Sequence, residues 1–238
     1  MNVTSIRLYV TASLAPHVPV AVSEPQAHYL SNVMRLAVGD QLRLFNGVDG
    51  EWRAQITAIT RKAVTLEPLS QTRPQQAEPD CWLCFALLKR QKTDMAVEKA
   101  TELGVSVIQP VLTARTQADH VNLDRLRAIA IEAAEQCERL VVPQIREPVT
   151  LARLMLNWPA GRALSVADER RTAKLLRPAT APTALLVGPE GGFTDAELEG
   201  IGANPLSMRV SLGARILRAE TAVIAGLTLL LASDPPEE

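Results

Sequence analysis

The strongest constraint on the fold is an alternation of apolar strand-like runs and helix-like segments that begins at Cys81. Residues 81–88, 105–112, 162–167 and 184–188 are predicted strands. Helices are predicted from Thr93 to before Gly104, from Asn122 to about Leu140, from Thr150, and near residues 169–176. Strands that are separated by crossover helices form a parallel sheet. We therefore expect an α/β domain over residues 81–238.

The first third of the chain has a different pattern. Residues 6–10 are a predicted strand, and Ser23-Glu-Pro-Gln26 is a capping box before a helix over residues 28–35. Apolar residues then alternate over residues 41–69, with turn pairs at Asn46-Gly47 and Asp49-Gly50, which predicts a small β-meander or barrel. We expect a β-barrel domain over residues 1–72 and a polar linker over residues 73–80.

Composition narrows the class of protein. The 238 residues are 47% hydrophobic, as expected for a globular chain, and the formal net charge of −1 argues against a protein that coats nucleic acid generally. Residues 1–73 hold seven Arg or Lys and five Asp or Glu, so any RNA contact depends on a local basic patch. We expect a cytoplasmic protein with no membrane segment, because neither a signal peptide nor a long apolar run is present.

The cysteines indicate neither a disulfide framework nor a metal site. The chain has three of them, an odd number that fits a reducing compartment. Cys81 and Cys84 stand three apart on a predicted strand, where their side chains point to opposite faces, and the sequence offers no second pair of ligands. We expect buried core cysteines and no bound metal.

Two loops near the carboxyl end carry unusual residues directly after predicted strands. The first is Gly188-Pro-Glu-Gly-Gly-Phe193, followed by a helix that Thr194 or Asp195 caps. The second surrounds Gly213 and leads to a helix that begins near Ala219 or Glu220. Residues 222–232 are apolar on every side but too few to span a membrane, so we expect this helix to be buried. Open α/β sheets bind ligands where strands end and helices begin. Neither loop matches a P-loop or a dinucleotide-binding pattern, and each alone is equally consistent with a tight turn.

Taken together and in this order, the two loops resemble the RsmE family of the SPOUT superfamily. The resemblance rests on residues 185–198 and 211–222, and it extends to His28-Tyr-Leu, Glu98–Gly104 and Glu132–Gln136. Glu138 departs from the family pattern, which has a small residue there. The resemblance implies an N-terminal PUA-like β-barrel that binds RNA and a C-terminal SPOUT α/β domain with a parallel sheet and a trefoil knot.

The resemblance also implies an activity. Members of this family transfer a methyl group from S-adenosyl-L-methionine to N3 of a uridine in 16S rRNA of the small ribosomal subunit, uridine 1498 in the usual rRNA numbering. N3 methylation needs a proton acceptor or stabilisation of the uracil anion. The expected catalytic residues are Arg218, which follows the second loop, and Glu220, although a surface ion pair between them is the alternative and the sequence does not identify the proton acceptor. The expected cofactor-binding residues are Leu186, Val187, Gly188, Glu190, Gly191, Gly192, Ser211, Leu212, Gly213, Ile216 and Leu217.

The remaining expectations concern partners. The candidate RNA-binding residues are Arg7, His28, Arg35, Lys89, Arg90 and Lys92, although a scattered surface charge is as often merely solvated. The resemblance implies a homodimer that acts on 16S rRNA or the small subunit. Three alternatives stay open: a SPOUT enzyme acting on tRNA or on a ribose 2′ oxygen, a noncatalytic RNA-binding protein, and a small-molecule α/β enzyme.

Overall fold

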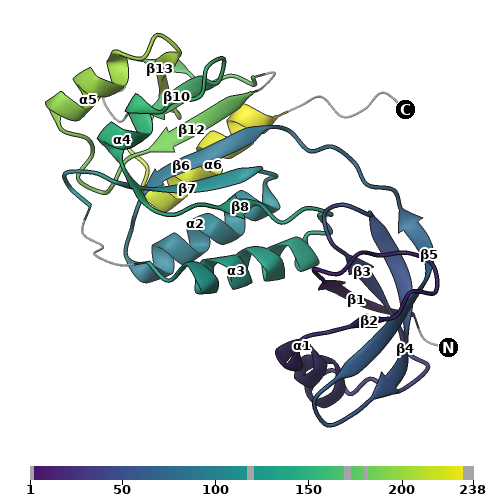
Figure 1. Cartoon of the computed structure of the whole chain (residues 1–238). Helices are drawn as coiled ribbons and strands as arrows, with labels where there is room; N and C mark the ends of the chain where they lie inside the picture. Colours follow the sequence, from purple (N-terminus) through teal and green to yellow (C-terminus); the bar gives the residue numbers. More distant parts are fainter. Residues whose placement is uncertain (1–2, 117–120, 169–172, 180–181, 233–238) are drawn as a thin grey trace. The chain divides into compact units, whose positions relative to one another are not determined.

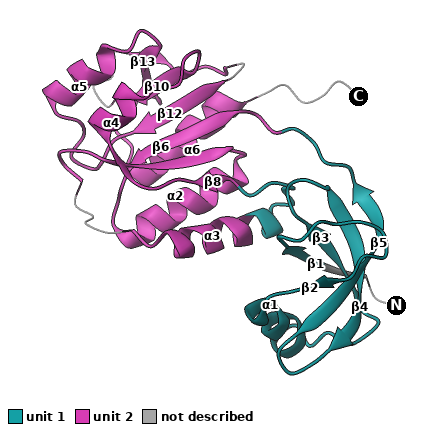
Figure 2. Ribbon diagram, in the orientation of Figure 1, with its two compact units in different colours: residues 1–77, 134–142 teal, residues 78–133, 143–238 magenta. Residues whose placement is uncertain are grey.

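The chain folds into two compact units. The computed structural model describes residues 3–116, 121–168, 173–179 and 182–232. Unit 1 comprises residues 1–77 and 134–142, and unit 2 comprises residues 78–133 and 143–238 (Figure 2). The chain therefore leaves unit 2, contributes nine residues to unit 1, and returns to unit 2.

Unit 1 is built on a curled sheet. In the described residues its strand order is β1 (Val3–Tyr9), β3 (Gln41–Phe45), β4 (Glu51–Ile59), β5 (Val64–Arg73) and β2 (Val20–Ala21) (Figure 1). The strands β3, β4 and β5 form the expected antiparallel meander, whereas β1 pairs with β3 in parallel. Alternate residues of these strands, such as Leu42, Leu44, Ala54 and Leu66, are buried in one apolar core.

The helical segment of unit 1 differs from the continuous helix that the sequence predicted. The capping box is confirmed: Gln26 Oε1 accepts a hydrogen bond from the Ser23 backbone N–H at 3.2 Å. The α-helix α1 (Glu24–His28) then widens into a π-turn η1 (Tyr29–Val33). Arg35 has a φ of +54°, a conformation that ends the helix before Gly39.

Unit 2 contains a parallel sheet, as the alternating pattern predicted. Its described strands follow the order β11 (Lys174–Leu175), β13 (Ser207–Ser211), β10 (Ala163–Ala167), β12 (Thr183–Val187), β6 (Cys81–Ala86), β7 (Val107–Leu112) and β8 (Gln144–Ile145), and β9 (Val149–Thr150) also pairs with β7. Every pairing among these strands is parallel. The expected α/β class with an N-terminal β-rich domain is confirmed.

Helices cover both faces of this sheet (Figure 1). Trp82, Cys84, Ala184 and Leu186 point to one face, where they pack in a core with α4 (Leu151–Leu156) and α5 (Asp195–Gly202). The alternate residue Leu185 points to the opposite face and lies against α6 (Ala219–Leu231). The helix α6 also packs on α2 (Arg90–Glu102). Side chains alternate between the two faces of a strand, so each central strand supports both helical layers.

Four local predictions need correction. The helix α2 begins at Arg90 and not at Thr93, whose hydroxyl instead bonds the backbone N–H and C=O of Leu88. The helix α3 (Leu123–Gln136) begins after Asn122, as predicted, but ends before Leu140 because Glu138 adopts a φ of +62°. Residues 174 and 175 form a strand where a helix was expected, and residues 169–172 lie outside the described part.

The fourth correction concerns α6, which is apolar all round but is not fully buried. Thr221 and Thr228 are exposed, while Ala222, Val223, Gly226 and Leu227 are buried. No helix in the described residues is long and apolar enough to cross a membrane.

Candidate functional site

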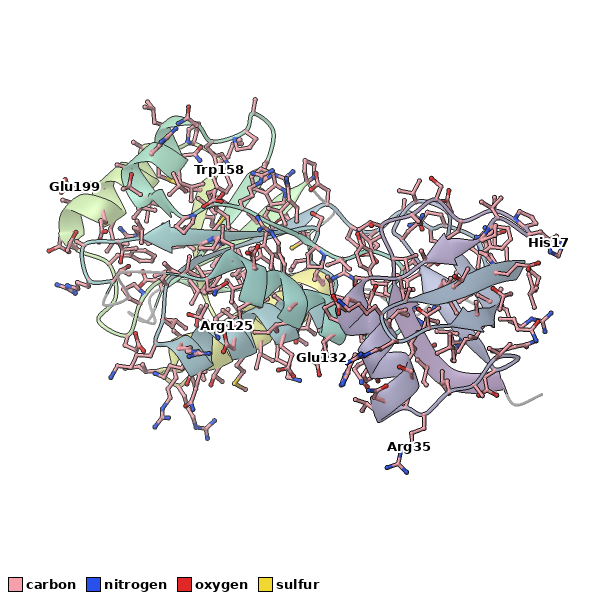
Figure 3. All side chains as sticks on the ribbon, turned by 60° about the horizontal axis from the view of Figure 1, so that its bottom comes forward. His17, Arg35, Arg125, Glu132, Trp158 and Glu199 are labelled. Atoms are coloured by element: carbon pink, nitrogen blue, oxygen red, sulfur yellow. The ribbon has the colours of Figure 1, made fainter. Side chains whose placement is uncertain are left out.

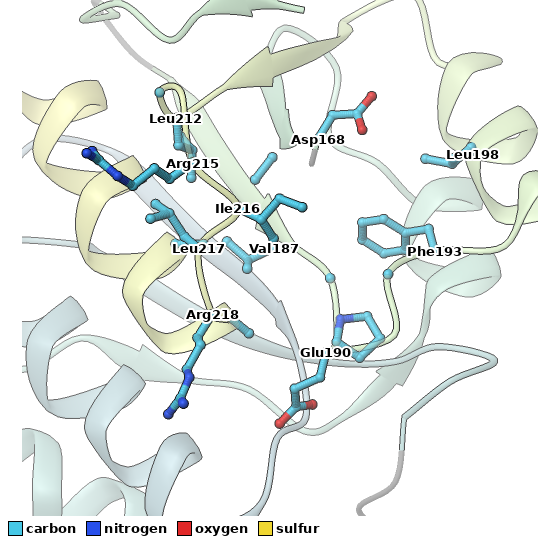
Figure 4. A pocket seen from close by; sticks show the side chains of 17 residues that line it. Asp168, Val187, Glu190, Phe193, Leu198, Leu212, Arg215, Ile216, Leu217 and Arg218 are labelled. Atoms are coloured by element: carbon cyan, nitrogen blue, oxygen red, sulfur yellow. The ribbon is translucent and has the colours of Figure 1, made fainter. Parts of the chain in front are cut away.

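The two loops that the sequence singled out meet at the carboxyl edge of the parallel sheet. The strand β12 ends at Val187 and enters the loop Gly188–Phe193, and β13 ends at Ser211 and enters the loop Leu212–Arg218. Both loops line one cavity of about 300 Å³ (Figure 4). The two strands belong to the same parallel sheet and flank β10, so their carboxyl ends open on the same side.

The first loop owes its shape to its glycines and to a capped helix. Gly192 has a φ of +68°, which favours glycine, and the missing side chain of Gly188 leaves room for the Phe193 ring. Thr194 caps α5, and the Glu197 carboxylate accepts a hydrogen bond from the Thr194 backbone N–H at 2.8 Å. This capping box fixes the point at which the loop becomes helix.

A neighbouring segment supports the outer side of the first loop. The Arg115 guanidinium donates a hydrogen bond to the Gly191 carbonyl, and the Ala114 N–H donates to Glu197 at 2.7 Å. The aliphatic part of the Arg115 side chain lies beside the position that a β-carbon on Gly191 would take, with Arg115 Cδ 3.2 Å from that position. Sequence reasoning missed Arg115, because nothing in its local pattern marks it as a loop contact.

The second loop turns at Gly213, which has a φ of +126°. The Ser211 hydroxyl accepts a hydrogen bond from the Gly213 N–H at 3.2 Å. The loop ends at Arg218, whose extended backbone makes it the N-cap of α6. Arg218 is exposed and lines the cavity, and its guanidinium makes no hydrogen bond or ion pair with the part of the chain that the structure describes.

Most of the predicted cofactor residues lie together. The cavity is lined by Val187, Gly188, Glu190, Gly192, Leu212, Gly213, Ile216 and Leu217, whereas Leu186, Gly191 and Ser211 are adjacent in sequence but outside its lining. The cavity also takes in Asp168, Phe193 and Arg215, which the sequence did not single out. In Figure 4, Arg218 and Glu190 come from different loops and extend toward the same side of the cavity.

A lysine from α2 contacts both the first loop and the start of α6. Lys92 Nζ is 2.9 Å from Glu190 Oε1 and 3.7 Å from Glu220 Oε2. The hydrogen bond with Glu190 raises the pKa of Lys92 and lowers the pKa of Glu190. Glu220 is buried, and its Oε2 has no hydrogen-bond partner among the described residues.

The predicted RNA-binding residues occupy different environments. His28, Arg35, Lys89 and Arg90 are exposed, and Arg35 projects away from unit 1 in Figure 3. Arg7 is buried: it donates to Glu51 at 2.7 Å and to the carbonyls of Ala134 and Arg139 at 2.8 Å, and it stacks on Phe45. Its donors are therefore used inside unit 1, and we correct its assignment from RNA contact to structural residue.

The cysteines are placed as expected. Cys81 and Cys84 are buried, and burial raises the pKa of each thiol to about 12. No group of three or more His, Cys, Asp or Glu residues suited to a metal ion occurs in residues 3–116, 121–168, 173–179 and 182–232.

The chain is similar in sequence to known protein families over both of its units. A family model described as an RNA methyltransferase domain matches residues 75–231, and one described as an RNA methyltransferase PUA domain matches residues 22–69. The ribosomal RNA small subunit methyltransferase E (RsmE) of Rickettsia conorii is 35% identical over 226 residues, which cover 93% of each chain. This chain belongs to the RsmE family.

Solved structures agree with the family and with the fold. The RsmE protein of Neisseria gonorrhoeae, solved bound to S-adenosylmethionine, is 27% identical, has a TM-score of 0.86, and matches 94% of this chain and 95% of its own. A Legionella pneumophila protein in complex with the same cofactor is 30% identical, with a TM-score of 0.84 and coverage of 94% and 96%. The RsmE fold thus accounts for both units of the chain.

Proposed function

We propose that this chain transfers a methyl group from S-adenosylmethionine to N3 of a uridine in 16S rRNA, at uridine 1498. One observation carries the proposal: the loops after β12 and β13 line a single cavity that Arg218 also lines, and Glu220 follows in the first turn of α6. Two RsmE-like structures with S-adenosylmethionine support the choice of cofactor.

The lining of the cavity fits this cofactor. Its volume of about 300 Å³ is at the lower end of the range for small-molecule sites. Leu212, Ile216 and Leu217 provide apolar surface for an adenine ring, and the glycines allow backbone groups to approach a ligand. Glu190 and Asp168 bring carboxylates that suit a cationic ligand. When bound, S-adenosylmethionine supplies an electrophilic methyl carbon on its sulfonium.

The reaction requires that N3 lose its proton as the new bond forms. The N3–carbon bond forms, the carbon–sulfur bond breaks, and its electron pair goes to sulfur. We assign the N3 proton to the carboxylate of Glu220, whose Oε2 lies 3.7 Å from Lys92 Nζ and accepts no hydrogen bond from the described residues. Arg218 cannot accept a proton at neutral pH, and its guanidinium instead stabilises negative charge that develops on a uracil oxygen.

The remaining proposals concern RNA and assembly. Lys89 and Arg90, exposed at the start of α2, and His28 and Arg35 of unit 1 are the proposed RNA contacts. We propose that the chain acts as a homodimer in the cytoplasm. We further propose the trefoil knot of the family. After β13 the chain passes through the second loop, and α6 then packs on β12 and β6.

The test is methylation of 16S rRNA, both free and in the small subunit, with radiolabelled S-adenosylmethionine, followed by mass spectrometry of the nucleosides. We expect 3-methyluridine at one position. Methylation of tRNA or of a ribose oxygen would point to another SPOUT activity. Absence of any transfer, with RNA binding retained, would point to a noncatalytic RNA-binding protein.

The Arg218→Ala variant tests the assigned chemistry. It should bind S-adenosylmethionine with nearly the wild-type dissociation constant in calorimetry, while kcat falls by roughly 100-fold or more, as is typical when a group that stabilises transition-state charge is lost. Arg218→Lys should restore only part of kcat, because an ammonium lacks the planar fork of a guanidinium. Equal retention of binding and turnover in Arg218→Ala would remove Arg218 from the mechanism.

A further inference from the structure

Lys92 contacts one acidic residue in the first loop of the candidate site and one in the first turn of α6. Its Nζ lies 2.9 Å from Glu190 in the first loop and 3.7 Å from Glu220, two residues beyond the second loop. About 29% of the Lys92 side chain is exposed, against 11% for Glu220, so this ammonium sits at the edge of a buried carboxylate. Lys92 itself lies on neither loop.

The local structure holds the Lys92 backbone in place. The Thr93 hydroxyl bonds the backbone of Leu88, which ties the first turn of α2 to the segment that follows β6. The helix α2 also packs along α6, the helix that carries Glu220. Lys92 therefore projects from a fixed helix toward both acidic residues.

We propose that Lys92 is a positioning residue of the methyl-transfer site, which holds Glu190 and Glu220 in place and balances their charge. This inference rests on the proposed function. Without the ammonium, two carboxylates from separate segments would face each other beside the cavity and repel. With it, the first loop and the start of α6 are held together, because one ammonium lies 2.9 Å from Glu190 and 3.7 Å from Glu220.

The charges around this pair are consistent with the assignment. The positive charge of Lys89 also acts to lower the pKa of Glu190, and that of Arg218 acts to lower the pKa of Lys92. The Arg115 guanidinium, which also contacts the first loop, donates a hydrogen bond to the Gly191 carbonyl. Among the residues that the structure describes, Lys92 is the basic residue that forms an ion pair with Glu190 and with Glu220. This use of the ammonium removes Lys92 from the set of proposed RNA contacts.

The test compares Lys92→Met with Lys92→Arg in the full-length protein, and Lys99→Met is the matched control. Lys99 lies on the same helix and also contacts two carboxylates, Glu98 and Glu102, each at 2.8 Å, but these lie outside the cavity lining. We expect Lys92→Met to lower kcat/KM for RNA methylation by about tenfold or more, in line with loss of a hydrogen bond between charged groups. Lys92→Arg should retain most of the activity, and Lys99→Met all of it.

A binding measurement separates this role from a general loss of structure. Calorimetry with S-adenosylmethionine across pH 4 to 8 should show a loss of affinity on the acidic side, as Glu190 becomes protonated. Because Lys92 lowers the pKa of Glu190, this loss should move to higher pH in Lys92→Met and stay in place in Lys92→Arg.

Two results would overturn the inference. One is a Lys92→Met enzyme with unchanged kcat/KM and an unchanged pH profile of cofactor binding. The other is a higher KM for RNA with a salt dependence reduced by about one charge, which would make Lys92 a phosphate contact. If the wild-type protein neither bound the cofactor nor methylated RNA, the proposed function itself would fail, and this outcome is visible before any variant is made.

Discussion

Gly226 of α6 lies so close to Leu185 of β12 that a β-carbon at position 226 would be 2.6 Å from Leu185 Cδ2. Leu185 is fully buried, so its side chain has no free space to move into. The contact sets how near α6 comes to the central strand of unit 2. It thereby places Arg218 and Glu220, at the start of α6, beside the loop that follows β12.

We expect Gly226→Ala to destabilise unit 2. Overpacking against Leu185 outweighs the gain in helix propensity, and the free energy of unfolding should fall by roughly 1–2 kcal/mol. The control is Gly200→Ala in α5, where nothing lies within 4 Å of the new β-carbon. That change should be neutral or slightly stabilising. Urea denaturation followed by circular dichroism measures both, and an equal effect of the two changes would contradict the close approach.

Gly191→Val should weaken cofactor binding. Its new β-carbon would lie 3.2 Å from Arg115 Cδ, and the two added methyl groups would push the first loop away from the Arg115 side chain. We expect the dissociation constant for S-adenosylmethionine to rise at least about tenfold, which corresponds to about 1.4 kcal/mol. Gly202→Ala, which has open space around its new β-carbon, is the control for calorimetry. Unchanged affinity in Gly191→Val would show that the loop does not need its present shape.

Arg7→Met should destabilise unit 1 severely. Arg7 and Glu51 are buried partners, and Arg7 also satisfies the last carbonyls around the end of α3. Removing one partner of a buried ion pair costs about 3–5 kcal/mol. Arg53→Met, a change at an exposed position of β4, should cost little. Thermal unfolding of both variants, monitored by calorimetry, checks the difference.

The same ion pair predicts a response to acid. Burial acts to raise the pKa of Glu51, but hydrogen bonds from Arg7 and Thr72 and the charges of Arg7 and Arg43 outweigh it, so this pKa is lowered overall. A lowered pKa gives stability that is present above the unfolded-state value of about 4.5 and is lost as pH falls through the folded value. Glu51→Gln should flatten the loss of stability below pH 4.5, and an unchanged acid-unfolding curve would contradict this.

Thiol labelling should distinguish the cysteines. Burial and a pKa of about 12 leave Cys81 and Cys84 almost without thiolate at neutral pH, whereas Cys137 is exposed. Native protein should therefore react with one equivalent of iodoacetamide, at Cys137, and denatured protein with three. Peptide mass spectrometry identifies the site. Labelling of Cys84 under native conditions would mean that the central strands open.

The sequence by itself determined the fold class and the two loops. Strand-like runs separated by helices predict a parallel sheet, and Gly192 and Gly213 mark turns because their positive φ values disfavour other residues. These are local properties, which depend on residues close together in the chain. The capping box at Ser23 and a helix cap at Thr194 or Asp195 could be predicted for the same reason, and the structure places the second cap at Thr194.

Only the tertiary structure decided how distant charges pair. Arg7 and Lys92 both had the sequence features of surface RNA contacts, yet Arg7 is buried against Glu51 and Lys92 bonds Glu190, 98 residues away. The end of α3 at Gln136 and the grouping of residues 134–142 with unit 1 could not be predicted either. The residues next to a charged side chain in the sequence do not show which residue it will pair with. The partner is chosen by the packing of elements that the chain brings together only when it folds.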